Sequence, residues 1–157
     1  MKIRKANISD LLKIQKLVTD TIRMVYPHYY PQGAVDFFLA HHSEENISAD
    51  IAQKYVYVCE DENIVGTITV KANEICRFFV APRHQRKGYG KAMIIFAEKL
   101  ISESSHEIVL DASLPAKKMY LKNGYEEIAY HEISAGSGDM LCYDVMRKKL
   151  NAEQVYI

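Results

Sequence analysis

An apolar strand, a basic loop and an amphipathic helix follow one another without a break between residues 75 and 101, and this succession constrains the fold most. The strand ends at Val80, and the loop after it holds two glycines, Gly88 and Gly90. Over Lys91–Ile101 the apolar residues recur at the spacing of an α-helix. A strand that leads through a loop into a helix favours a sheet with helices packed on its faces.

The loop has the chemistry of an anion cradle. Its two glycines let the backbone bend with no Cβ in the way, so that successive N–H groups converge on one anion. The unpaired first-turn amides of the following helix lie at the positive end of the helix dipole. Every charged side chain between Ile75 and Ala97 is basic, although the whole chain has a net charge of zero. The pattern predicts a pyrophosphate site, and the alternative is a solvated basic loop that only caps a helix.

Two common phosphate-binding loops are excluded. The Walker pattern fails because the sequence contains no Gly-Lys-Ser/Thr with the required upstream glycine. The dinucleotide fingerprint needs a third small residue three positions after Gly90, and Met93 stands there.

The rest of the chain mixes strand pairs with strand–helix–strand units. Alternation and β-branched residues predict strands, and apolar residues at helical spacing predict helices. The expected strands are Lys2–Ala6, Tyr55–Cys59, Ile64–Val70, Ile75–Val80, Ile108–Leu110, Tyr125–Tyr130 and Met140–Met146. The expected helices are a first one capped by Asn7 or Ser9 with apolar residues up to Val25, then about Gln32–His42, Lys91–Ile101 and Pro115–Lys122. No linker or repeat divides the chain, so we expect one domain over residues 1–157, of the α+β (mixed α/β) class.

Charge and cysteine content limit the partners. Lys+Arg and Asp+Glu both number 20, which disfavours a nucleic-acid or membrane-surface binder, because both need a cationic field. No run approaches the ~18 apolar residues of a spanning helix. Cys59, Cys76 and Cys142 are far apart in apolar stretches. We therefore expect neither a disulfide framework nor a metal site, and interpret the chain as a reduced, cytoplasmic protein with buried thiols.

Two motifs together resemble the GCN5-related N-acetyltransferase (GNAT) superfamily. The pattern QxxGxG at Gln85–Gly90, after a strand that ends in Val80–Pro82, resembles the family's motif A. Leu110–Ser113 followed by Ala116–Tyr125 is similar to its motif B. The motifs stand in the family's order, and the resemblance covers roughly residues 2–149.

The resemblance implies a single GNAT domain whose mostly antiparallel mixed sheet is splayed between its fourth and fifth strands, with helices on both faces. Acetyl-CoA would bind in the splay, its pantetheine arm hydrogen-bonded to the fourth strand as an added strand would be. The cofactor-binding residues implied in this way are Phe78, Phe79, Val80, Gln85, Arg86, Lys87, Gly88, Tyr89, Gly90, Lys91 and Ser113. The family often has Asn where Ser113 stands, so Ser113 would make a weaker contact.

The resemblance also implies two catalytic residues. Tyr120 stands where the family places the acid that protonates the departing CoA thiolate, and the alternative is a tyrosine that only packs on the sheet. An alkyl amine of pKa ~10.4 is only about one part in two thousand neutral at pH 7, so some group must take its proton. Glu74, four residues before Phe78, stands where the histone-acetylating branch places its base; an ordinary turn acid, with water as the base, is the alternative.

The implied reaction is direct attack of a primary amine on acetyl-CoA in a ternary complex, without an acylated enzyme or a metal. A small-molecule acceptor is favoured because the aromatic segment from Tyr26 to Phe38 could close over a compact ligand; a peptide or protein amine is the alternative.

His41 and His42 are expected at a surface helix end. Other hypotheses are a non-catalytic acyl-CoA sensor, disfavoured by Tyr120, and a nucleic-acid module, disfavoured by the neutral charge. Family members are often dimers, so a homodimer is compatible with the sequence.

Overall fold

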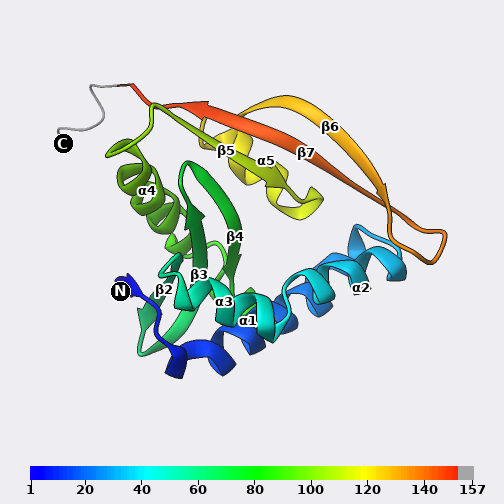
Figure 1. Cartoon of the computed structure of the whole chain (residues 1–157), viewed down its shortest axis with the longest axis horizontal. Helices are drawn as coiled ribbons and strands as arrows, with labels where there is room; N and C mark the ends of the chain where they lie inside the picture. Colours follow the sequence, from blue (N-terminus) through cyan, green and yellow to red (C-terminus); the bar gives the residue numbers. More distant parts are fainter. Residues whose placement is uncertain (152–157) are drawn as a thin grey trace.

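The structure is a computed structural model and describes residues 1–151. Seven strands form one mixed sheet in the order β1-β2-β3-β4-β5-β7-β6 (Figure 1). The strands are β1 Lys2–Lys5, β2 Val56–Asp61, β3 Asn63–Lys71, β4 Glu74–Val80, β5 Glu107–Ala112, β6 Glu126–Ser134 and β7 Met140–Lys149. The helices are α1 Leu11–Val25, α2 Gln32–His41, α3 Glu44–Ala52, α4 Tyr89–Ser102 and α5 Leu114–Lys122, with short 3₁₀ turns at Ile8–Asp10, Tyr26–His28 and Pro82–His84.

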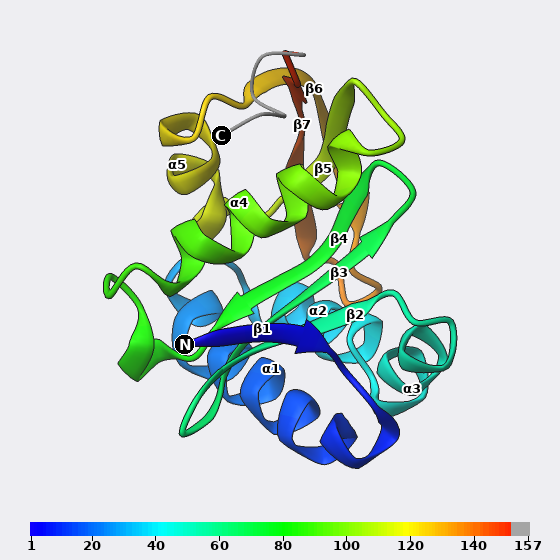
Figure 2. The ribbon, with the colours of Figure 1, turned by 90° about the vertical axis from the view of Figure 1, so that its left-hand side faces the viewer.

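Helices cover both faces of the sheet (Figure 2). On one face α4 and α5 pack over a core that includes Met93, Ile101 and Leu110. On the other face α1, α2 and α3 pack over a second core that includes Ile14 and Ile47. The α+β class and the helices on both faces, predicted from the sequence, are confirmed.

The sheet splits between β4 and β5, its one parallel pair. These strands pair only where Glu74 lies opposite Val109 and Ile75 opposite Leu110, and beyond that point they diverge. All other neighbouring strands are antiparallel. A register shift between β3 and β4 leaves Cys76 without a partner on β3, and this bulge bends β4 where the split begins. The predicted splay is therefore confirmed.

Helix α3 was not predicted from the sequence. Its nine residues carry mostly polar side chains, and only Ile47, Ile51 and two alanines are apolar. The helix is held by a cap at its start, where the Ser43 hydroxyl accepts the Asn46 N–H, and by ion pairs of Asp50 with two strand residues. Such tertiary support overrides a weak local pattern.

Within residues 1–151 no helix is long and apolar enough to cross a membrane. Cys59 is buried, Cys76 and Cys142 are half-buried, and all three are free thiols. The same residues contain no cluster of three or more His, Cys, Asp or Glu side chains arranged to hold a metal ion.

Candidate active site

The split between β4 and β5 opens two adjoining cavities. The first, here named the cleft cavity, has a volume of about 460 Å³ and contains Glu74 and Tyr120 in its lining. The second, the loop cavity, has a volume of about 340 Å³ and contains Arg86 and Gly90. Residues that line both are Tyr26, Phe78, Phe79, Ser113 and Ala116. The two cavities thus meet at the free end of β4 and the first turns of α5.

The basic loop presents a row of unpaired backbone donors. Within the described chain, none of the six N–H groups from Arg86 to Lys91 donates an intramolecular hydrogen bond. Gly88, the N-cap of α4, has a φ of 92°, a left-handed conformation that strains any residue with a Cβ. A Cβ on Gly90 would project to within 3.8 Å of Phe78 and Val80 on the cavity wall. The loop therefore has the conformation and the free donors of an anion cradle.

Two side chains fix the ends of this loop. The Gln85 amide donates a hydrogen bond of 3.0 Å to the carbonyl oxygen of Val80, which ties the loop to β4. The Tyr89 hydroxyl donates to Asp61 on β2. Gln85 lines the loop cavity, but its amide nitrogen is already engaged in holding the loop.

Arg77 does not belong to the basic field of the loop, although it falls in the same stretch of sequence. It is buried on β4, where its guanidinium lies 3.0 Å from Asp50 and donates to Thr69 and to Nδ1 of His42. Lys71 also pairs with Asp50, at 2.6 Å. The positive charge available to an anion at the loop comes instead from Arg83, Arg86, Lys87 and Lys91.

His42 is part of this buried network, and the expectation of an exposed helix end is wrong for it. It is 8% exposed, and its Nδ1 accepts from Arg77, which requires a lone pair on that nitrogen. Burial, with the charge of Arg77 as a smaller cause, lowers the pKa of His42 to about 3. His41 is exposed as expected, but one side of it lines the cleft cavity. This partial burial lowers the pKa of His41 as well.

Tyr120 projects from α5 into the cleft cavity. The residue is 4% exposed, and its ring lies between the rings of Phe78 and Tyr125, at centroid distances of 6.5 and 5.4 Å. Its hydroxyl forms no hydrogen bond with any of residues 1–151. Burial raises the pKa of Tyr120, so the phenol keeps its proton at neutral pH and can donate it.

Glu74 lines the same cavity from the start of β4, and its side chain is exposed there. Ile75 and Phe78 both pack towards α4 although they are three residues apart, because the bulge at Cys76 breaks the alternation. Glu74 and Phe78 therefore lie on opposite faces of β4, where a regular strand would place residues four apart on the same face. The split between the strands still lets both reach the cavity.

The aromatic segment between α1 and α2 has divided roles. Tyr26 stacks against Phe79 at 6.2 Å, lines both cavities and donates a hydrogen bond of 3.4 Å to Ser113. Tyr29 is exposed at the loop cavity. Tyr30 is buried, and its hydroxyl bonds backbone groups of α5 and β7 instead of facing a cavity.

The β6–β7 hairpin closes the α2 end of the cleft cavity. The Asp139 carboxylate accepts a hydrogen bond of 2.8 Å from the N–H of Gly33 in the first turn of α2. A Cβ on Gly33 would lie 2.0 Å from the Ser137 hydroxyl and 2.7 Å from the Asp139 carboxylate, so a larger residue there would force these side chains to shift. From the hairpin, Ile133, Leu141 and Tyr143 add apolar surface to the cavity.

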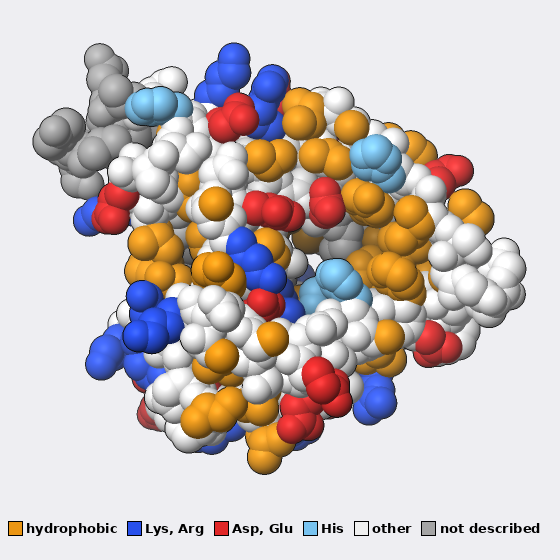
Figure 3. All heavy atoms as spheres, in the orientation of Figure 1, with side chains coloured by type: hydrophobic (Ala, Val, Ile, Leu, Met, Phe, Trp, Pro, Cys, Tyr) orange, Lys and Arg blue, Asp and Glu red, His pale blue; other side chains and the backbone are white. Residues whose placement is uncertain are grey.

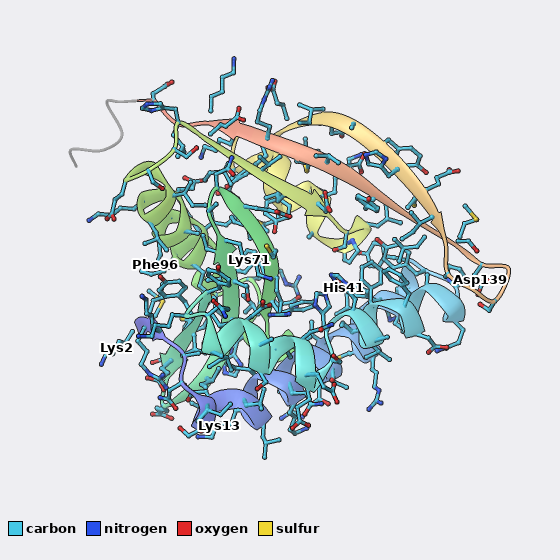
Figure 4. All side chains as sticks on the ribbon, viewed as in Figure 1. Lys2, Lys13, His41, Lys71, Phe96 and Asp139 are labelled. Carbon is cyan, nitrogen blue, oxygen red and sulfur yellow. The ribbon has the colours of Figure 1, made fainter. Side chains whose placement is uncertain are left out.

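Asp111 and His41 also line the cleft cavity, although neither was predicted from the sequence as a site residue. Figure 3 shows acidic side chains above the opening and Lys and His side chains below it. Figure 4 shows Lys71 and His41 beside the same opening. Asp111 is the last residue but one of β5, near the carboxyl end of the parallel pair, a position where ligands commonly bind, and that signal was available in the sequence.

Comparison with protein families identifies this architecture. A family model described as an acetyltransferase (GNAT) domain matches residues 25–141. The chain belongs to the GNAT family. The resemblance inferred from motifs A and B is thereby confirmed, and the protein is a GNAT-type acetyltransferase.

Individual GNAT proteins agree with this assignment. A spermidine N(1)-acetyltransferase from Thermoplasma acidophilum is 22% identical over 145 residues, which cover 80% of this chain and 88% of that protein. A GCN5-related N-acetyltransferase from Rhodopseudomonas palustris superposes with a TM-score of 0.86, at 20% identity over 95% of both chains. The PaiA N-acetyltransferase from Thermoplasma acidophilum, solved with coenzyme A, superposes with a TM-score of 0.74 at 21% identity, over 94% of this chain and 98% of that one. These structures share the fold of the GNAT protein described above.

Proposed function

We propose that this GNAT protein transfers the acetyl group of acetyl-CoA to a primary amine by direct attack in a ternary complex. The observation that carries the proposal is the meeting of the two cavities at the free end of β4. One cavity contains the loop with the unpaired amides of Arg86–Lys91, and the other contains the unpaired hydroxyl of Tyr120. A bound thioester at the junction would have an anion cradle behind it and a proton donor beside it.

The loop cavity is the proposed site of acetyl-CoA. Backbone amides of Arg86–Lys91 would bind the pyrophosphate, and the basic side chains of the loop would add a screened attraction. Beyond Ile75, β4 has no strand partner on its β5 side, so backbone groups of Phe78, Phe79 and Val80 are free to bind the pantetheine arm as an added strand. Ser113 lies at the junction, 3.4 Å from Tyr26, as a polar contact for the cofactor.

In the proposed reaction each of the two catalytic residues transfers one proton. The amine nitrogen attacks the thioester carbonyl carbon, and the tetrahedral intermediate collapses as the C–S bond breaks. Tyr120 gives its phenol proton to the departing sulfur, while Glu74 takes the proton lost by the nitrogen, directly or through a water. Because a thiol of pKa ~8.5 leaves easily, Tyr120 contributes a moderate factor to the rate.

A small-molecule amine is the proposed acceptor. The cleft cavity is walled by α2 on one side and by β7 on the other, and the docked hairpin closes one end. The spermidine acetyltransferase among the relatives makes polyamines the first acceptors to try. A peptide or protein amine is the alternative.

We also propose a single domain over residues 1–157 and a cytoplasmic location. Three free cysteines support the location.

A thiol-release assay tests this function. The protein is incubated with acetyl-CoA and a panel of polyamines, monoamines, amino acids, aminoglycosides and short peptides, and free CoA is measured. We expect release that depends on a small amine, with the acetylated amine detected by mass spectrometry. Tight binding of acetyl-CoA without release for any amine would favour the non-catalytic sensor instead.

A further inference from the structure

The cations that line the cleft cavity are paired with a carboxylate, whereas the carboxylates that line it are not paired with a cation within residues 1–151. Its two cations, Lys71 and Arg77, are both paired with Asp50 of α3, at 2.6 and 3.0 Å. Its two carboxylates, Glu74 and Asp111, form no ion pair with any other group in the described part of the chain. The cations are therefore already neutralised in part, and the carboxylates remain available to a positively charged ligand.

The register of the split places both carboxylates on one face of the sheet. Glu74 lies opposite Val109, and Asp111 follows Val109 by two residues, so it points to the same side. The intervening Leu110 packs into the α4–α5 core, which confirms that Asp111 faces the opposite way, into the cleft cavity. Regular strand spacing and rise would put the two Cα atoms roughly 8 Å apart, and the divergence of the strands beyond Leu110 adds to this distance.

The titratable groups of residues 1–151 that act on Asp111 are two histidines, with no Lys or Arg among them. His41 approaches from α2 and His131 from β6, while Tyr143 of β7 lines the cavity beside it. Burial lowers the pKa of His41, so this imidazole is uncharged at neutral pH. Partial burial also raises the pKa of Asp111, as expected for a carboxylate that lacks a close cation.

An independent observation marks the same cavity as a ligand site. Tyr120 is 4% exposed and lines this cavity, and its hydroxyl, which stays open to the cavity, has no hydrogen-bond partner among residues 1–151. A buried polar group without a partner is costly unless a ligand or water supplies one. Tyr120, Glu74 and Asp111 thus line one cavity, with Asp111 two residues further along the paired strands than Glu74.

We propose that the acceptor is a diamine or polyamine and that Asp111 binds its second, unreacting ammonium group. This inference rests on the proposed function. The reacting nitrogen must be neutral when it attacks, so it loses its charge to Glu74 or water. A second ammonium group keeps its charge through the reaction and can pair with Asp111 throughout. Phe37 of α2 and Tyr143 of β7 give the cavity aromatic walls. Such walls suit the methylene chain between the two nitrogens.

Matched amines test the assignment. Steady-state kinetics compare 1,4-diaminobutane with n-butylamine, which has the same carbon chain and one ammonium fewer. We expect Asp111→Asn to raise KM for the diamine ~10- to 100-fold, the range for a hydrogen bond to a charged group, with little change for butylamine and in kcat. Asp111→Glu keeps the negative charge and should retain part of the preference for the diamine over butylamine. Glu107→Gln, on the same strand and face but outside the cavity, is the control.

The outcomes separate this inference from the proposed function. An equal effect of Asp111→Asn on both amines, or no effect on either, would overturn the role of Asp111 while leaving acetyl transfer intact. Calorimetric titration of 1,4-diaminobutane into the CoA-saturated protein compares the diamine affinity of the wild type with that of Asp111→Asn, without turnover. Diamine binding that Asp111→Asn weakens, in a protein that transfers no acetyl group, would overturn the proposed function and support the assignment of Asp111.

Discussion

The phenol oxygen of Tyr30 accepts a hydrogen bond of 2.7 Å from the backbone N–H of Leu114, the first residue of α5. The same hydroxyl donates to the carbonyl oxygen of Cys142 on β7, at 3.4 Å. Next to this contact, Tyr26 bonds Ser113, the N-cap of α5. Two tyrosines of the segment between α1 and α2 thus hold the start of the helix that carries Tyr120.

Replacing Tyr30 by Phe should therefore loosen α5. The change leaves a first-turn N–H without its partner, which should lower the free energy of unfolding by ~1–3 kcal/mol. Because α5 carries Tyr120, we expect kcat to fall as well, with the Kd for acetyl-CoA unchanged. Denaturant unfolding and calorimetry measure the two effects. Tyr29→Phe is the matched control, since that exposed hydroxyl has no partner within residues 1–151; equal stability of the two variants would contradict the role of Tyr30.

Replacing Gly90 by Val should block the loop cavity without unfolding the protein. The added Cβ meets only ordinary contacts at 3.8 Å, but the valine methyl groups extend between Phe78 and Val80 into the cavity. We expect acetyl-CoA binding to be lost in calorimetry while the melting temperature stays close to that of the wild type. Lys87→Ala, which removes one screened charge, should weaken binding only several-fold. A folded Gly90→Val protein with normal affinity would show that the cofactor lies elsewhere.

The Tyr120 hydroxyl should serve the chemical step. Tyr120→Phe keeps the ring between Phe78 and Tyr125 and removes only the proton donor. We predict a fall in kcat of ~10- to 1000-fold, the span of general acid catalysis widened for a good leaving group, with little change in acetyl-CoA affinity. Pre-steady-state kinetics must show that chemistry limits turnover. An unchanged rate of that step would leave Tyr120 as a packing residue.

The buried His42 should make stability depend on pH. Its pKa is about 3 in the folded protein and near 6.5 when unfolded, so the unfolded chain binds more protons between these values. Stability is then complete above pH 6.5 and falls as the pH drops towards 3, by up to ~1.4 kcal/mol per pH unit. Unfolding by urea from pH 7 to 4 measures the slope. His42→Asn should flatten it, whereas His28→Asn, at an exposed site, should leave the slope in place.

The parts of the fold that local patterns determine were predictable, and the parts that depend on tertiary pairing were not. The segment from β4 through α4 followed from its apolar period and its two glycines, because each residue there favours one local structure. Helix α3 did not, since its stability depends on Asp50 meeting Lys71 and Arg77, which lie about 20 residues or more away in sequence.

The residues of the candidate site also fall into those that local motifs predict and those that depend on tertiary pairing. Tyr120 and the loop residues belong to motifs with fixed spacing, so the sequence predicted them as a group. Asp111 and His41 come together only because β5 pairs with β4 over two residues and α2 crosses the opening. The bulge at Cys76, which turns Glu74 away from the face of Phe78, is likewise a property of the β3–β4 register that a single strand does not reveal.

Glu74 is the proposed acceptor of the amine proton, and the pH dependence of the rate tests it. It lies at the edge of the cleft cavity, on the same face as Asp111 and in the cavity that holds Tyr120. If it takes the proton, Glu74→Gln should depress kcat/KM most at neutral pH, where the amine is mainly protonated. Raising the pH towards the amine pKa of ~10.4 should recover much of the loss, because solvent then removes the proton.

The control for this profile is Glu62→Gln, at the exposed turn of the β2–β3 hairpin and outside both cavities. Wild type and both variants are compared from about pH 6 to 10 on the amine that the thiol-release assay identifies. Convergence of Glu74→Gln with the wild type at high pH, while Glu62→Gln follows the wild type throughout, assigns the base. A Glu74→Gln profile parallel to the wild type would remove this carboxylate from the mechanism, because a constant factor reflects binding or stability and not proton transfer. The proton would then leave through water, with His41, which lines the same cavity, as the next group to replace.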